Sequence, residues 1–201
     1  MASFFSKLFG KRREPIIIVS GLPRSGTSMM MRMLEQGGVP IVQDGIREPN
    51  ADNPKGYYEF ERVKKLPDGD TDWLPDARGK AVKVIAALLL HLPDTYRYNV
   101  LFMRRDMNEV LASQRRMLIR RGEDPHAVDD AEMARLFEKH LAQVYTWMEE
   151  QPNLAYLNVD YNAALSDPRP IVEQVEAFLS LELDVERMAA VVDPELYRQR
   201  K

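Results

Sequence analysis

The chain has 201 residues, no cysteine and a formal net charge of −3 at pH 7. This length suits one domain with a full core, and the absence of cysteine excludes disulfides, thiolate metal sites and thiol chemistry. The small negative charge argues against a general nucleic-acid-binding protein, and no apolar run approaches the roughly 20 residues of a membrane-spanning helix. We expect an N-terminal tail over 1–14 and a single domain over 15–201 in a cytoplasmic protein.

The N-terminal tail combines apolar and basic residues. In this tail the charges follow the apolar residues, which is the wrong order for a signal peptide. One interpretation is a frayed tail, and the other is a basic amphipathic helix at the surface of an anionic membrane. The residues concerned are Phe4, Phe5, Leu8 and Phe9, with Lys7, Lys11, Arg12 and Arg13.

The first element of the domain is an apolar, β-branched run over 16–20, which is typical of a buried parallel strand. A turn rich in glycine and proline follows to Gly26, and 27–36 has the pattern of a helix that ends at two glycines. In a strand–loop–helix of this kind, backbone N–H groups and the positive end of the helix dipole converge. We therefore expect the loop to bind a phosphate or a sulfate.

The rest of the chain alternates between strand and helix patterns. This alternation predicts a three-layer α/β fold, a mostly parallel sheet with helices on both faces, like that of P-loop NTPases. Ligands of such folds bind beyond the carboxyl ends of the strands. The predicted strands lie near 39–42 and at 81–85, 99–103 and 155–159, and the predicted helices at 86–92, 106–121 and 130–150, with further helices towards the end; no element is assigned to the polar segment up to about 79.

The loop after the first strand nearly matches the nucleotide-binding pattern G-x-x-x-x-G-K-[ST]. Gly21, Gly26 and Ser28 are in register, but Thr27 takes the place of the lysine. The basic residue comes earlier, at Arg24. Hydrolysis of ATP or GTP needs the lysine on the terminal phosphates, so the loop argues against an NTPase. A purely structural turn is the alternative.

Residues 23–28, P-R-S-G-T-S, resemble the 5′-phosphosulfate loop of sulfotransferases that use 3′-phosphoadenosine-5′-phosphosulfate (PAPS). The pattern of that family is P-[KR]-S-G-T-[ST]. The resemblance implies that the phosphosulfate is held by Arg24, Ser25, Gly26, Thr27 and Ser28.

A second match follows the strand predicted at 99–103. The family binds the 3′-phosphate with an arginine at a strand end and a serine eight residues later, and Arg105 and Ser113 have this spacing. Two helical turns separate the pair, so both side chains can reach one phosphate. The alternatives are a surface ion pair for the arginine and a bond to its own helix for the serine. A third, structural match covers 161–181, so the resemblance spans about 15–181.

Sulfuryl transfer needs a base on the acceptor and cations on the transferring group. Many cytosolic members of the family place a histidine two residues after a lysine; here Lys83 matches the lysine, but Ile85 stands at the histidine position. Residues 53–59, N-P-K-G-Y-Y-E, instead resemble the N-P-x-G-[YFW]-x-E segment of the branch with protein-tyrosine and many bacterial sulfotransferases. That resemblance implies Glu59 as the base, with Glu61 as the reserve. A solvated loop carboxylate is the alternative.

The sequence is thus interpreted as a PAPS-dependent sulfotransferase that releases 3′-phosphoadenosine-5′-phosphate (PAP). Glu59 would deprotonate the acceptor, and Lys83 and Arg24 would neutralise the moving group. No metal is expected, because fixed cations and amides do what Mg²⁺ does in kinases. The alternatives are a kinase with a variant P-loop, in which Asp160 binds the metal, and a non-catalytic nucleotide-binding protein. The family's R-K-G is missing near the C-terminal end, and the acceptor could be a small molecule, a glycan or a peptide.

Overall fold

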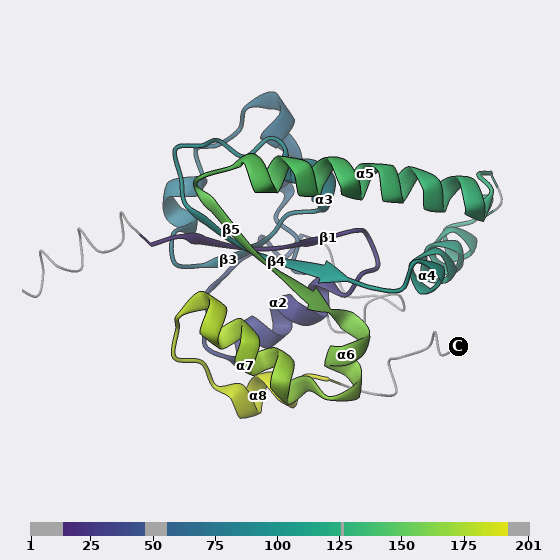
Figure 1. Ribbon diagram of the computed structural model, residues 1–201. Coiled ribbons are helices and arrows are strands. Elements are labelled where there is room, and N and C mark those ends of the chain that lie inside the picture. The colour runs from purple at the N-terminus through teal and green to yellow at the C-terminus, as the bar shows by residue number, and fades with distance from the viewer. Residues whose placement is uncertain (1–13, 47–55, 126, 193–201) are drawn as a thin grey trace, which may run out of the picture.

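The computed structural model describes residues 14–46, 56–125 and 127–192. Within these ranges five parallel strands form one sheet in the order β2-β3-β1-β4-β5. Helices cover both faces of the sheet (Figure 1), so the predicted three-layer α/β fold is confirmed. The strands are β1 (Ile16–Gly21), β2 (Ile41–Val42), β3 (Ala81–Lys83), β4 (Tyr98–Arg104) and β5 (Leu154–Asp160).

One face of the sheet is covered by α3 (Ala86–Leu89), α5 (Asp130–Glu150) and two 3-10 helices, Glu61–Asp68 and Leu74–Ala77. The sequence analysis assigned no element to the segment with the 3-10 helices. It folds here because its few apolar side chains are all buried against the sheet and α5, beneath polar neighbours. These side chains are Val63, Leu66, Trp73, Leu74 and Ala77.

The opposite face is covered by α2 (Thr27–Gln36), α7 (Pro168–Leu179) and α8 (Val185–Ala189). Helix α7 begins after Asp167 with a proline in its first turn. The short helix α6 (Tyr161–Ser166) precedes it as a separate element, which the sequence analysis did not distinguish. None of the helices in the described ranges is long and apolar enough to cross a bilayer.

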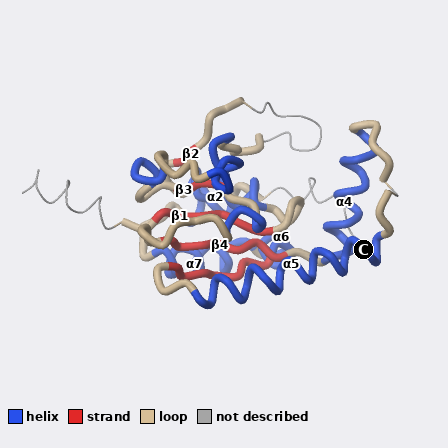
Figure 2. Tube along the Cα trace, turned by 90° about the horizontal axis from the view of Figure 1, so that it is seen from above, coloured by secondary structure: helices blue, strands red, loops and turns tan. Residues whose placement is uncertain are grey.

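Several boundaries differ from the predicted ones. Strand β3 ends at Lys83 and not at 85, because Ile85 leaves the sheet and becomes the N-cap of α3. Helix α3 ends at Leu89, three residues earlier than predicted, in a stretch of 3-10 turns before Pro93. Helix α4 (Met107–Arg120) and α5 agree closely with the predicted ranges. In Figures 1 and 2, α4 lies beyond the carboxyl end of β4, beside the first turns of α5.

Strand register brings the two predicted phosphate motifs together. Gly21 pairs with Met103, so the loop after β1 leaves the sheet next to the segment after β4. On one side Lys83 of β3 pairs with Val19, and on the other Asp160 of β5 pairs with Arg104. The ends of four neighbouring strands thus meet at one edge of the sheet. The tail over 1–13, the N-P-K part of the 53–59 match and residues 193–201 lie outside the described residues.

Candidate active site

The loop between β1 and α2 is shaped by two glycines. Gly21 has a φ of +145° and Gly26 a φ of +100°, values that L side chains rarely adopt. A Cβ on Gly21 would lie 2.5 Å from Ser25 Oγ, and a Cβ on Gly26 would lie 2.3 Å from the ring of Tyr161. Both positions therefore require glycine for space as well as for backbone conformation.

The same loop offers donors to an anion. Gly26 is the N-cap of α2, no side chain caps the helix, and no acidic residue stands in its first turn. The first N–H groups of a helix have no intrahelical partners. Ser25 is 1% exposed, and its hydroxyl has no hydrogen-bond partner among the described residues. A buried hydroxyl of this kind, beside a helix N-terminus, fits an anion with several acceptor oxygens.

Arg24 connects this loop to the second motif. Its Nε donates to Ser113 Oγ at 2.9 Å, and its backbone carbonyl accepts a hydrogen bond of 3.0 Å from Arg105 Nη1. The residue has a φ of +70°, an uncommon value for a side chain of this size. The structure thus brings the loop, Arg105 and Ser113 together, although their roles in binding remain predictions.

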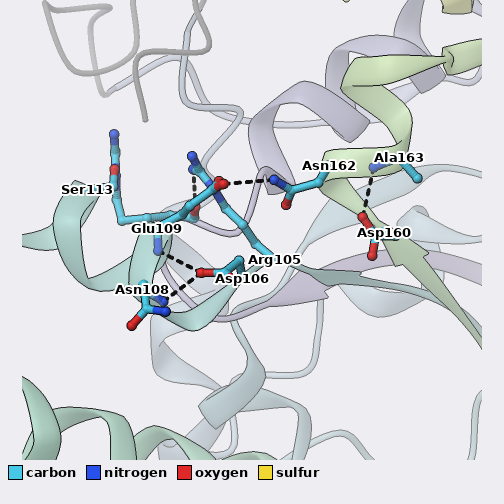
Figure 3. Close-up of polar contacts among 9 residues, drawn as sticks. Arg105, Asp106, Asn108, Glu109, Ser113, Asp160, Asn162 and Ala163 are labelled. Carbon is cyan, nitrogen blue, oxygen red and sulfur yellow. Dashed lines mark hydrogen bonds and ion pairs between the residues drawn. The ribbon is translucent and has the colours of Figure 1, made fainter. Parts of the chain in front are cut away.

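Arg105 also contacts side chains of α4 and α6. Its Nε donates to Glu109 Oε2 at 3.0 Å, and its guanidinium carbon lies 4.4 Å from the ring centroid of Tyr161. Asn162 Nδ2 donates to the other oxygen of Glu109 at 2.9 Å (Figure 3). Burial raises the pKa of the Tyr161 phenol, so this hydroxyl stays protonated. These interactions link the β1–α2 loop to α4 and α6.

The sequence analysis missed Glu109, Tyr161 and Asn162. Arg105 and Glu109 are four positions apart, which is the spacing of a helical ion pair, and this signal could have found the carboxylate. Asn162 gave no comparable signal, because its partner comes from a segment that only the pairing of β4 with β5 brings near.

The other side of the loop carries the predicted catalytic pair. Lys83 Nζ lies 3.6 Å from Glu59 Oε1, with side chains only 8% and 18% exposed. Lys83 Nζ and Ser28 Oγ both donate to the carbonyl of Tyr57, the latter at 3.3 Å. The candidate base, the candidate cation and the first turn of α2 are therefore neighbours. Whether the pair performs catalysis stays a prediction.

The segment that carries Glu59 is fixed by its neighbours. Tyr58, with a φ of +52°, donates its phenol hydrogen to Glu35 Oε2 at 2.7 Å. Burial is the main cause that raises the pKa of Tyr58, and the hydrogen bond to the Glu35 carboxylate raises it further, so the phenol remains a donor. The carbonyl of Glu59 accepts from the N–H of Asp44 at 3.2 Å. Glu61 instead pairs with Lys64 at 2.7 Å with its side chain 40% exposed.

Asp160, the metal ligand of the kinase alternative, has a different role in the structure. Its side chain accepts from the N–H of Ala163 at 2.8 Å and caps α6 (Figure 3). The described part of the chain contains no cluster of three or more histidine or carboxylate side chains arranged to hold a metal ion.

The chain resembles known proteins in a family pattern and in fold. A family model described as "Sulfotransferase family" matches residues 55–185. No curated protein gives a significant match. Among solved structures, the sulfotransferase domain from the Synechococcus PCC 7002 olefin synthase is 16% identical, with a TM-score of 0.53, over 94% of this chain and 84% of that one. The sulfotransferase domain from the curacin biosynthetic pathway is 15% identical, also with a TM-score of 0.53, over 92% and 89%.

Proposed function

The chain belongs to the sulfotransferase family, and on that premise we propose that it transfers a sulfuryl group from PAPS to a hydroxyl or amine acceptor without a metal. The observation that carries the proposal is the anion cradle after β1. There the hydroxyl of Ser25 is buried without a partner among the described residues, and Gly21 and Gly26 let Ser25 and Tyr161 approach the loop backbone more closely than any side chain would allow.

The residues present fit the phosphates of the donor. The backbone of the loop and the hydroxyls of Ser25, Thr27 and Ser28 would hold the 5′-phosphosulfate at the N-terminus of α2. Arg105 and Ser113, which meet at Arg24, would hold the 3′-phosphate. The second phosphate is what separates this nucleotide from an ordinary adenosine monophosphate, so this pair would set the specificity for the donor.

The donor supplies the sulfuryl group: as sulfur bonds to the acceptor oxygen or nitrogen, its bond to the phosphate oxygen breaks and PAP leaves. Glu59 would take the proton of the acceptor, because its carboxylate lies beside Lys83, which shares the Tyr57 carbonyl with Ser28 of the first turn of α2. Lys83 would stabilise negative charge that develops beside it, and its contact with the Tyr57 carbonyl fixes its direction. A glutamate base would place the chain in the branch with protein-tyrosine and bacterial sulfotransferases.

Binding of three nucleotides, titrated calorimetrically with EDTA present, tests the donor site. Ser25→Ala should weaken PAP and adenosine 5′-monophosphate alike, by about threefold to tenfold, and leave adenosine 3′-monophosphate unchanged. Ser113→Ala should weaken PAP and the 3′-monophosphate and leave the 5′-monophosphate unchanged. Each variant is thereby the control of the other. Equal losses for all three ligands would contradict the proposal, as would Mg²⁺-dependent binding of ATP in a parallel titration without EDTA.

A further inference from the structure

A buried carboxylate stands beside the proposed nucleotide site and has no part in the proposed reaction. Glu109 is 4% exposed and lies in the first turn of α4. Asp106, the N-cap of that helix, accepts hydrogen bonds from the N–H groups of Asn108 and Glu109 at 3.0 and 3.3 Å. This cap determines where the helix begins, and so where Glu109 lies (Figure 3).

Both oxygens of Glu109 have donors from different parts of the chain. Oε2 accepts from Arg105 Nε at 3.0 Å and Oε1 from Asn162 Nδ2 at 2.9 Å. Asn162 lies in the first turn of α6, whose start is fixed in turn by Asp160. Two capped helix starts therefore bring three side chains together. A buried charge is tolerated only with such partners, and these also fix its orientation.

Three contacts fix the position of the Arg105 guanidinium. Nε is bonded to Glu109, Nη1 to the carbonyl of Arg24, and the flat face lies over the ring of Tyr161. A guanidinium has five N–H donors in a rigid fork, and two of them are used in this way. Nη2 has no recorded hydrogen bond to any described residue, so this edge can serve a phosphate.

The negative charge of Glu109 disfavours the binding of an anion nearby. A carboxylate next to Arg105 offsets the positive potential that would attract a phosphate. As an anchor it works for the site, because a fixed arginine binds a phosphate without first losing conformational freedom. These two effects have opposite signs in a binding experiment.

We propose that Glu109 is a positioning residue of the donor site, which acts through Arg105. With Asn162 as its second anchor, it holds the guanidinium against the loop carbonyl of Arg24 and directs its remaining donors to the 3′-phosphate. The inference rests on the proposed function, since it assumes that a 3′-phosphorylated nucleotide binds here.

The test is the affinity of Glu109→Ala for PAP. Positioning predicts binding about tenfold to a hundredfold weaker than that of the wild type, because a charge-assisted contact is lost. Charge alone predicts tighter binding. Affinity for adenosine 5′-monophosphate should change less than the affinity for PAP. Glu173→Ala, which removes the same charge from an exposed pair with Arg169, should leave both affinities unchanged.

Two further variants extend the test, and the second keeps it valid if Glu109→Ala does not fold. Glu109→Gln retains an oxygen for Arg105 and should bind PAP more tightly than the alanine variant. Asn162→Ala leaves the ion pair in place and should weaken PAP by about twofold to fivefold through the loss of one hydrogen bond. Affinity for PAP equal to or higher than that of the wild type in Glu109→Ala, or in Asn162→Ala where the first is unfolded, would overturn the inference.

Hydrogen exchange of the ligand-free protein distinguishes a failure of the inference about Glu109 from a failure of the proposed function. The amides of Leu22 and of residues 24–26 should exchange faster in Glu109→Ala and Asn162→Ala than in the wild type or in Glu173→Ala. A wild type that does not bind PAP would overturn the proposed function, while faster exchange would still support an anchor for the loop. A wild type that binds PAP, with neither exchange nor affinity altered in the variants, would overturn only the role of Glu109.

Discussion

Replacement of Glu59 by glutamine is expected to lower turnover by about 10²–10⁴-fold and to leave PAP affinity within about threefold of the wild type. Glutamine keeps the size of the side chain but cannot accept the proton of the acceptor. The Glu59 side chain is 18% exposed and lies next to Lys83. Water therefore has limited access to this position and can take over the role of the base only in part. PAP affinity should not follow turnover, because the nucleotide product has no proton to transfer.

Glu61→Gln is the matched control for this experiment. Its carboxylate pairs with Lys64 at the surface and should be dispensable. If Glu61→Gln lost turnover and Glu59→Gln did not, the base would be assigned to the wrong residue. If neither lost turnover, the base would lie elsewhere.

Lys83→Met is expected to lower turnover by about 10²–10³-fold, with a much smaller effect on PAP affinity. Methionine preserves most of the apolar side chain, which is 8% exposed, and removes only the charge. Because PAP lacks the sulfuryl group, a cation directed at that group contributes to the transition state and little to product binding. Single-turnover rates with PAPS, measured beside PAP titrations, give the two quantities.

Lys83 also contacts Glu59, so its effect must be separated from that of the base. In the double variant Lys83→Met with Glu59→Gln, independent roles predict that the two losses multiply, whereas a single unit predicts a loss close to that of the larger single variant. Equal losses of PAP affinity and turnover in Lys83→Met would assign the lysine to binding and not to the transfer step.

Much of the fold was predictable because its signals are local. The apolar run of β1, the glycine loop and the helix that follows are adjacent in sequence, and α2 agrees with the predicted range of 27–36. The 3-10 helices of residues 61–77 were not predictable in the same way. Their apolar side chains are sparse, and they stabilise these helices only once they are buried in the core around Trp73 and Leu74.

The candidate site likewise has parts that local sequence patterns predict and parts that they do not. Arg24, Arg105 and Ser113 stood in recognisable patterns, but their meeting depends on the register of β1 with β4, which no local pattern contains. The contact between Lys83 and Glu59 depends on the segment around Tyr58, which folds back onto Glu35 of α2. Positions were therefore predictable from motifs, and partners across the sheet edge were not.

Acceptor-dependent conversion of PAPS in the presence of EDTA tests the central claim most directly. The enzyme is offered PAPS, or ATP with Mg²⁺ in a parallel reaction, together with phenols, sugars and tyrosine peptides. The account predicts one PAP and one sulfated product for each PAPS consumed, at a rate that EDTA does not change. Phosphorylation of an acceptor by ATP with Mg²⁺, without conversion of PAPS by any acceptor, would contradict it.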